Sequence, residues 1–169
     1  MLRRLLPALV LALALLAVPA VAQETVTVKP PEVFAAKIDR INARAKGPVL
    51  LPSRMTVEAT RLYTSGGATR GGWDLELAAA PDCGGANACF VAMFQGQRGG
   101  KLPGRPNARL ANGDPAFFHP VTCGGSCAPN SFWFTHNGYL YSWQAKDLRA
   151  PEKAIMTQMA NQAIAAGPR

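Results

Sequence analysis

Residues 132–143 are Phe132-Trp133-Phe134-Thr135-His136-Asn137-Gly138-Tyr139-Leu140-Tyr141-Ser142-Trp143. Two runs of aromatic and β-branched residues flank Asn137-Gly138, and Asn-Gly is the preferred pair for a two-residue type I′ turn between antiparallel strands. Such a turn pairs His136 with Tyr139 and fixes the register along both strands. Six side chains then share one face of the hairpin: Phe132, Phe134, His136, Tyr139, Tyr141 and Trp143. The other face receives Trp133, Thr135, Leu140 and Ser142.

The aromatic face of this hairpin needs an apolar partner, and the segment that follows supplies one. A helix is predicted from Pro151 to Ala165, because proline suits the first helical position and Gly167-Pro168 ends the helix. Its apolar stripe consists of Ile155, Met159 and Ala163, with Met156 and Ala160 alongside. Aromatic faces also stack on sugars and peptides, but Phe132 and Phe134 carry no polar group for a ligand. We therefore expect the hairpin to bury this face against the closing helix.

The remaining residues predict one α+β domain. An apolar stripe at Phe34, Ile38, Ile41 and Ala45 has helical spacing and ends at Gly47-Pro48. Strands are expected within 55–63, 73–77, 88–94 and 116–121, and glycine- and proline-rich loops at 65–72, 81–86 and 96–106. The predicted architecture is a bent antiparallel β-sheet flanked by an N-terminal and a C-terminal helix.

Residues 1–22 have the three parts of a secretory signal peptide. Arg3 and Arg4 form the positive region, residues 5–18 are apolar apart from Pro7, and Ala20-Val21-Ala22 is a small-residue cleavage site. The apolar run of about 14 residues is shorter than the ~20 that a membrane-spanning helix requires. We expect cleavage after Ala22, which leaves a single disulfide-containing domain over 23–169, with no transmembrane segment, in the periplasm or outside the cell.

The charge of that domain limits the classes of partner that it is expected to bind. The formal net charge of +8 falls to +6 when Arg3 and Arg4 leave with the signal peptide. A basic exported protein meets anionic envelope polymers rather than nucleic acid, and the chain has no nucleic-acid recognition pattern. Four cations lie within residues 98–109 without an acid among them: Arg98, Lys101, Arg105 and Arg109. They are the candidate site for an anionic ligand, and an ordinary solvated loop is the alternative.

The four cysteines predict two disulfides, because an exported domain folds in an oxidising compartment. The pairs Cys83–Cys89 and Cys123–Cys127 are favoured, since each brackets two glycines that let the chain turn sharply. Two metal sites are weighed as alternatives. A zinc site from four thiolates has loose spacing, and a copper site would join Cys123 and Cys127 to His119 or His136. No cofactor and no metal are expected.

No catalytic set is recognisable, and the chain contains no G-x-S-x-G, S-x-x-K or H-E-x-x-H motif. Asp74 and Glu76 share one face of a predicted strand, which suits glycoside chemistry, but a solvated face opposite Trp73, Leu75 and Leu77 is the favoured interpretation. An enzyme with an unrecognised site would use His119 or His136. A histidine bonded to a carboxylate in a cleft would support that hypothesis.

Several short motifs from Leu51-Pro52-Ser53-Arg54-Met55 onward resemble small exported bacterial proteins of unknown function. The motifs are Ala88-Cys89-Phe90, Leu110-Ala111-Asn112-Gly113, Cys123-Gly124-Gly125-Ser126-Cys127, Asn137-Gly138-Tyr139-Leu140-Tyr141 and Met159-Ala160-Asn161-Gln162-Ala163-Ile164. The resemblance implies no activity.

These observations favour a non-enzymatic envelope protein that binds an anionic or glycan ligand, or another envelope protein. One alternative is an unrecognised periplasmic enzyme or a Cys/His metal-binding protein. Another is a secreted inhibitor of a wall hydrolase, although a charge of +6 would be repelled by a cationic target such as lysozyme.

Overall fold

The Asn137-Gly138 hairpin is the centre of the fold in a computed structural model of the chain. The structure describes residues 25–169 except 46, 60, 85, 147 and 149–150, so the predicted signal peptide and its cleavage site lie outside the described residues. The hairpin consists of β10 (Asn130–His136) and β11 (Tyr139–Ala145), and His136 pairs with Tyr139. Asn137 and Gly138 have φ of 48° and 77°, as a type I′ turn requires. The predicted turn and register are confirmed.

The hairpin belongs to a seven-stranded antiparallel sheet with the strand order β3-β4-β5-β11-β10-β7-β6. Its other strands are β3 (Tyr63–Thr69), β4 (Gly72–Ala78), β5 (Phe90–Arg98), β6 (Ala108–Arg109) and β7 (Pro115–His119). Two small ribbons are separate sheets: β1 (Thr25–Val28) with β2 (Met55–Glu58), and β8 (Thr122–Cys123) with β9 (Cys127–Ala128). The predicted α+β class with an antiparallel sheet is confirmed.

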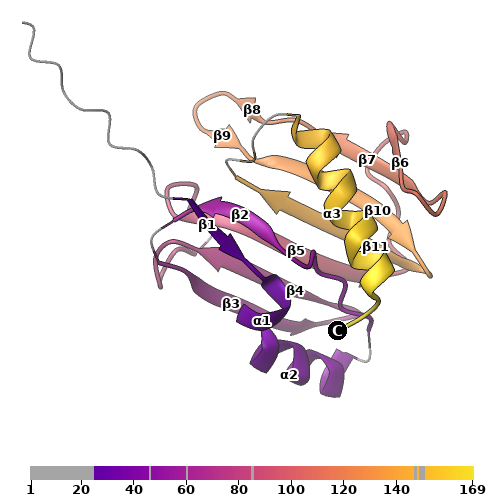
Figure 1. Cartoon of the computed structure of the whole chain (residues 1–169), viewed down its shortest axis with the longest axis horizontal. Helices are drawn as coiled ribbons and strands as arrows, with labels where there is room; N and C mark the ends of the chain where they lie inside the picture. Colours follow the sequence, from indigo (N-terminus) through magenta and orange to yellow (C-terminus); the bar gives the residue numbers. More distant parts are fainter. Residues whose placement is uncertain (1–24, 46, 60, 85, 147, 149–150) are drawn as a thin grey trace, which may run out of the picture.

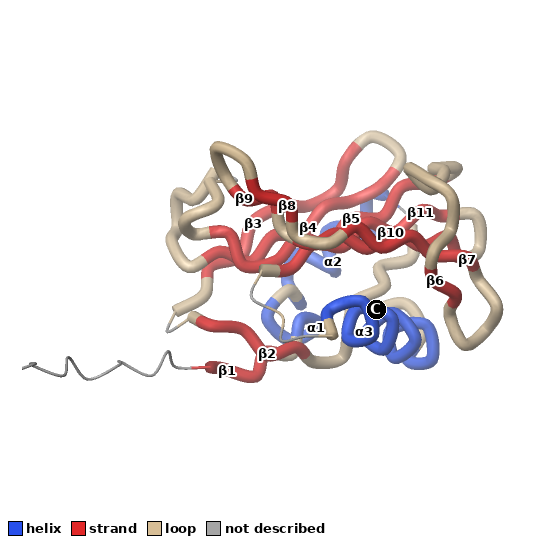
Figure 2. The backbone as a smooth tube through the Cα atoms, turned by 90° about the horizontal axis from the view of Figure 1, so that it is seen from above, coloured by secondary structure: helices blue, strands red, loops and turns tan. Residues whose placement is uncertain are grey.

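Helices precede and follow the large sheet. The predicted N-terminal helix is confirmed only in part, because Phe34 leaves the helical conformation and separates α1 (Pro30–Val33) from α2 (Ala35–Ala45). The C-terminal helix α3 (Glu152–Ala166) ends at Gly167, whose φ is 77°, as predicted. Figure 2 shows α1, α3 and the β1–β2 ribbon on one side of the large sheet. We call the sheet face on that side the inner face and the opposite face the outer face.

The inner face forms the core of the domain. A row of side chains in register crosses β4, β5, β11 and β10, and each is at most 1% exposed: Leu75, Phe94, Trp143 and Phe132. Phe134 stacks on Tyr141 with ring centroids 4.9 Å apart. Helix α3 adds Met156, Met159, Ala160 and Ala163 to the same cluster. The aromatic face of the hairpin is therefore buried with the closing helix, as predicted, although His136 and Ile155 are only half-buried.

Three predictions about strands and loops need correction. The segment predicted as a strand at 55–63 divides into β2 and the start of β3, and strands β3 and β5 extend into the predicted loops at 65–72 and 96–106. Gly72 and Gly96 lie in these strands because a side chain at either position would clash with a neighbouring strand or side chain. A Cβ on Gly72 would lie 2.0 Å from the carbonyl oxygen of Gly96, and one on Gly96 would lie 2.5 Å from the indole nitrogen of Trp73.

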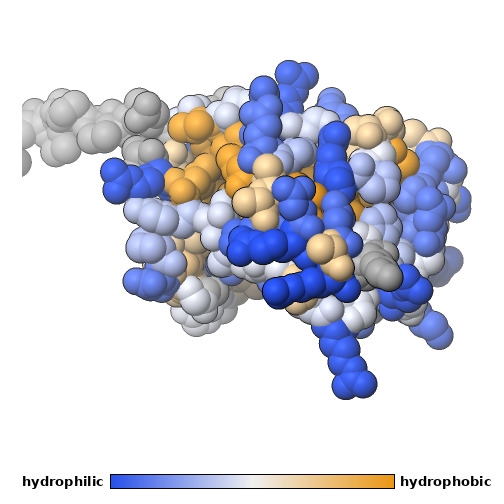
Figure 3. All heavy atoms as spheres, turned by 90° about the horizontal axis from the view of Figure 1, so that it is seen from below, coloured by the Kyte–Doolittle hydropathy of each residue, from blue (hydrophilic) through white to orange (hydrophobic). Residues whose placement is uncertain are grey.

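Within the described ranges, no helix is long and apolar enough to cross a membrane. The large hydrophobic side chains that are exposed there are Val26, Val33 and Val121. Figure 3 shows hydrophobic side chains gathered where the described chain begins, with hydrophilic side chains around them.

Candidate functional site

The outer face of the large sheet carries a row of functional side chains. In register across five neighbouring strands it contains Asp74 on β4, Gln95 on β5, Ser142 on β11, Trp133 on β10 and Phe117 on β7. We call these five residues the outer row. All five are half-buried, whereas the inner-face residues on either side of them in each strand are buried, apart from Phe118 on β7. With neighbouring strands about 4.8 Å apart, the outer row spans about 19 Å.

An aromatic pair forms one end of the outer row. The rings of Phe117 and Trp133 have centroids 5.8 Å apart and a tilt of 40°. The loop between β5 and β6 lies against this end of the face. A Cβ on Gly104 would be 3.0 Å from the Phe117 ring, and one on Gly100 would be 2.7 Å from Cβ of Leu140. Glycine at these two positions lets the loop backbone approach the sheet closely.

Three of the four predicted cations border the outer face. Lys101 and Arg105 directly follow the two glycines that contact the sheet, and both are exposed. Arg109 pairs with Pro115 across β6 and β7, which places it on the outer face at the edge of the sheet, and its Nη1 donates to the Gly113 carbonyl at 2.7 Å. Among the described residues, no carboxylate forms a salt bridge with any of these cations.

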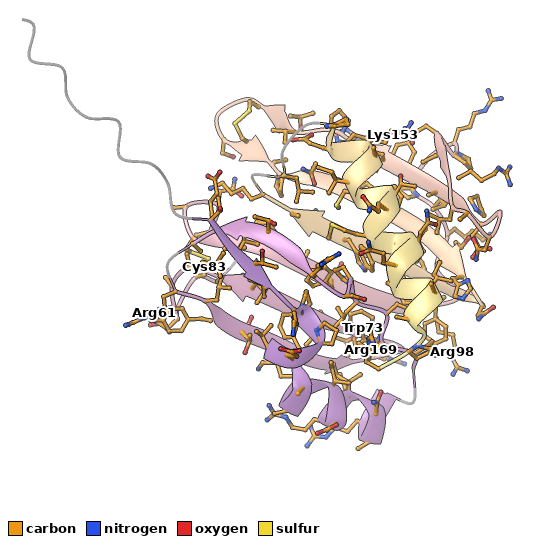
Figure 4. The ribbon with its side chains drawn as sticks, viewed as in Figure 1. Arg61, Trp73, Cys83, Arg98, Lys153 and Arg169 are labelled. Atoms are coloured by element: carbon orange, nitrogen blue, oxygen red, sulfur yellow. A yellow bond between two sulfur atoms is a disulfide. The ribbon has the colours of Figure 1, made fainter. Side chains whose placement is uncertain are left out.

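Arg98, the fourth predicted cation, belongs to the other face. It pairs in register with Tyr139, whose side chain lies on the inner face. The Nε atom of Arg98 donates to the Tyr139 hydroxyl at 3.2 Å, and the guanidinium lies 5.6 Å from the centroid of that ring. Figure 4 shows Arg98 at the opposite end of the sheet from Cys83. The four cations therefore do not form a single cluster.

The loop that carries Lys101 and Arg105 is anchored at its C-terminal end. The Asn107 side chain donates to the Phe118 carbonyl and accepts from the Phe118 amide, both at 2.8 Å. Lys153 at the start of α3 donates to the Asn107 carbonyl. These contacts fix the C-terminal end of the loop against β7. Lys101 and Arg105 therefore extend from a loop whose backbone is anchored to the domain.

Carboxylates lie at the other end of the outer face. Asp74 and Glu76 share this face of β4, as their spacing predicts, and both are half-buried. Amide and hydroxyl groups separate them from the aromatic pair. Gln144 on β11 donates to the Ser131 hydroxyl on β10 at 3.1 Å, in the row next to the outer row. The face thus changes from acidic through neutral polar to aromatic and cationic.

The predicted disulfides Cys83–Cys89 and Cys123–Cys127 are both present, with Cα atoms 5.7 Å and 4.0 Å apart. Because all four sulfurs are bonded in pairs, the zinc and copper alternatives have no thiolate to serve as a ligand. In the part of the chain that the structure describes, no three His, Cys, Asp or Glu side chains gather into a metal site. The Asn87 side chain donates to the Cys127 carbonyl at 2.8 Å and so links the two disulfide loops.

The two histidines considered for catalysis lie on opposite faces. His119 is exposed on the outer face of β7, while His136 lies on the inner face at the hairpin turn. The Nδ1 of His136 is 2.6 Å from the Asp114 carboxylate, and the Asn112 side chain donates to the same oxygen at 2.7 Å. The Asn137 amide lies 3.1 Å from the Nε2 atom. These contacts join the hairpin turn to the turn at 112–114, and neither histidine lines the groove described below.

A groove that the sequence does not predict lies between β2 and α3, with a volume of about 620 Å³. Its walls are residues 54–58 and residues 155–162, which are far apart in the sequence, so no local pattern brings them together. Its apolar residues are Met55, Val57, Leu148, Ile155 and Met159, and its polar residues are Thr25, Thr27, Arg54, Thr56, Glu58, Gln158 and Gln162.

Comparison of the chain with protein-family profiles, curated proteins and solved structures returns no match. The function must therefore be inferred from the geometry of the outer face and of the groove.

Proposed function

We propose that this chain is an exported, non-enzymatic domain that binds an acidic polysaccharide on the outer face of its large sheet. The observation that carries the proposal is the Phe117–Trp133 pair, 5.8 Å between centroids, bordered by Lys101, Arg105 and Arg109. Aromatic rings stack on the apolar faces of sugar rings, and Trp133 adds an N–H donor. Arginine and lysine bind the carboxylate or sulfate groups of an acidic sugar.

The polarity of the outer face favours one placement of such a ligand. Acidic sugar groups fit the end with Lys101, Arg105 and Arg109, where no described carboxylate neutralises the cations. Sugar hydroxyls fit the opposite end, because Asp74 accepts hydrogen bonds and Gln95 both donates and accepts them. A span of about 19 Å suits several consecutive sugar rings rather than a single monosaccharide.

Binding explains this surface better than catalysis does. Asp74 and Glu76 lie on the outer face of the sheet, and neither lines the groove between β2 and α3. His136 bonds to Asp114 on the inner face, away from those carboxylates. Catalytic groups must converge on one reacting atom, and these do not.

We also infer that the domain works outside the cytoplasm after cleavage behind Ala22. Two disulfides suit an oxidising compartment, and the resemblance to small exported bacterial proteins points the same way. N-terminal sequencing of the protein recovered from the periplasm or the medium should begin at Gln23. Recovery of the chain with Met1 from the membrane fraction would contradict this.

Binding is tested by titrating the protein with polygalacturonate in a calorimeter. Trp133→Ala should weaken binding about tenfold, since one stacking ring contributes on the order of 1 kcal/mol or more. The pair Lys101→Ser and Arg105→Ser should weaken it as well, and should reduce its dependence on salt, because exposed charges are screened over about 8 Å at physiological ionic strength.

The matched control is Arg40→Ser with Arg44→Ser on α2, which removes the same charge from exposed positions elsewhere. This control should bind polygalacturonate like the unmodified protein. An equal loss of affinity in both charge variants would mean that only the net charge matters and would reject the site. Neutral dextran should bind much more weakly than polygalacturonate.

A further inference from the structure

We propose that the groove between β2 and α3 binds a short extended peptide with free termini, which adds to the β1–β2 ribbon as a third strand. This site is separate from the outer face, and it does not depend on polysaccharide binding there.

The groove runs along β2, and Thr25 and Thr27 of β1 also line it. Figures 1 and 2 both show β2 between β1 and α3, and all five residues from Arg54 to Glu58 line the groove. Its volume of about 620 Å³ lies within the range of small-ligand sites. Met55, Val57 and Met159 are each at most 5% exposed, so they form an apolar floor that is already packed.

On the edge of β2 toward α3, the backbone groups have no hydrogen-bond partner among the described residues. In the described residues β2 pairs with β1 and with no other strand. No other backbone hydrogen bond joins residues 54–58 to a described segment. An unpaired strand edge presents N–H and C=O groups in the spacing that another strand needs. Addition of an extended peptide to such an edge is a recurring mode of recognition.

Charges at the two ends of β2 set the direction and the length of the peptide. Arg54 and Glu58 line opposite ends of the groove, about 13 Å apart along an extended strand. Neither forms a salt bridge with a described residue. A peptide antiparallel to β2 would place its ammonium group at Glu58 and its carboxylate at Arg54. The spacing fits four or five residues, and a longer chain would move one charged terminus away from its partner.

The floor and the far wall set the side-chain preference. Alternate residues of an extended peptide face the same side, so those above Met55, Val57 and Met159 should be apolar. Gln158 and Gln162 lie one helical turn apart on α3 and line the opposite wall, where their amides can bond the outer backbone edge of the peptide. The ligand class is therefore a tetra- or pentapeptide with apolar side chains at alternate positions and two free ends.

Calorimetry with three versions of the peptide Val-Ala-Val-Ala-Val tests the proposal: free at both ends, N-acetylated, and C-amidated. The free peptide should bind best, and each blocked peptide should bind roughly fivefold more weakly, as expected for a solvent-accessible ion pair. Glu58→Gln should weaken the free peptide by the same factor and leave the acetylated peptide unchanged. Arg54→Gln should do the same for the amidated peptide.

Control variants separate this site from general effects of charge and from the outer face. Asp39→Asn and Arg44→Gln on α2 change the same charges at exposed positions and should have no effect. Trp133→Ala should also leave peptide binding unchanged. In addition, amide hydrogen exchange within 54–58 should slow when the free peptide binds, because its backbone would pair with β2.

Three results would overturn the proposal. The first is no heat of binding for the free peptide at millimolar concentration. The second is equal loss of affinity for free and acetylated peptides in Glu58→Gln, which would show that Glu58 does not contact the peptide ammonium. Binding without slower exchange in β2 would likewise rule out strand addition.

Discussion

At the scale of single residues, the carbonyl oxygen of Pro48 accepts two hydrogen bonds from the core. The Trp73 indole donates to it at 3.1 Å, and the Tyr141 hydroxyl donates to it at 3.3 Å. Tyr141 is fully buried in the sheet. Burial, and secondarily the neighbouring Tyr139, raise the pKa of Tyr141 well above its ordinary value of 10.0. The folded protein therefore keeps a phenol proton that the unfolded chain releases at alkaline pH.

This difference predicts how stability depends on pH. A raised pKa in the folded state means that the contribution of Tyr141 is complete below about pH 10 and is lost as the pH rises further. The free energy of unfolding should therefore fall with rising pH above about pH 10. In Tyr141→Phe this contribution to the fall should disappear, which changes the slope by up to about 1.4 kcal/mol per pH unit for one proton. Urea unfolding between pH 8 and 11 measures the slope.

Tyr63→Phe is the control for the alkaline experiment, because Tyr63 is only half-buried and its hydroxyl meets Arg61 near the surface. It should retain the slope of the unmodified protein. Equal slopes for the unmodified protein and for Tyr141→Phe would show that Tyr141 ionises alike in both states. At neutral pH, Tyr141→Phe should cost about 1 kcal/mol for the lost hydrogen bond to Pro48.

At the scale of elements, the hairpin could be predicted together with its register, but the glycine-rich strands could not. Asn137 and Gly138 act locally, since their φ values select one turn and that turn pairs the residues beside it. Gly72 and Gly96 act at a distance, since they leave space for neighbouring backbone and for Trp73. A glycine in a sequence indicates either a turn or a place where the backbone packs closely against a neighbour. The predicted loops at 65–72 and 96–106 were therefore partly wrong.

The two faces of the hairpin make a second prediction. Phe134 on the inner face is fully buried, whereas Phe117 on the outer face of the adjacent β7 is half-buried. Phe134→Ala should lower the free energy of unfolding by about 3 to 5 kcal/mol, a large part of the total stability of a domain this size. Phe117→Ala should cost less than half as much, because part of its ring already contacts solvent.

Urea unfolding of the two phenylalanine variants distinguishes a core face from a ligand-binding face. Loss of stability in Phe134→Ala with little loss in Phe117→Ala supports the assignment of the faces. A midpoint for Phe134→Ala near that of the unmodified protein would contradict it and would make the inner face the candidate binding surface.

At the scale of the whole molecule, long-range pairing creates both candidate sites. The outer row requires β4, β5, β11, β10 and β7 to align in one register, and only the β10–β11 part follows from local sequence. The cationic segment 98–109 was recognised from composition, but its division between the two faces depends on which strand partner each residue meets. The groove forms because β2 lies beside α3, and no sequence motif predicts that contact. The sequence therefore shows which aromatic, acidic and basic side chains are available, and the pairing of the strands determines which of them share a face.

The positions of the three tryptophans allow the outer-face site to be tested directly. Trp133 is half-buried in the outer row, whereas Trp73 and Trp143 are at most 1% exposed on the inner face. Titration of the ¹⁵N-labelled protein with trigalacturonate should therefore shift the indole N–H signal of Trp133 to saturation, together with the amides of Lys101 and Arg105. The indole signals of Trp73 and Trp143 should stay in place. A Trp133 signal that does not move while trigalacturonate binds would contradict polysaccharide binding on the outer face.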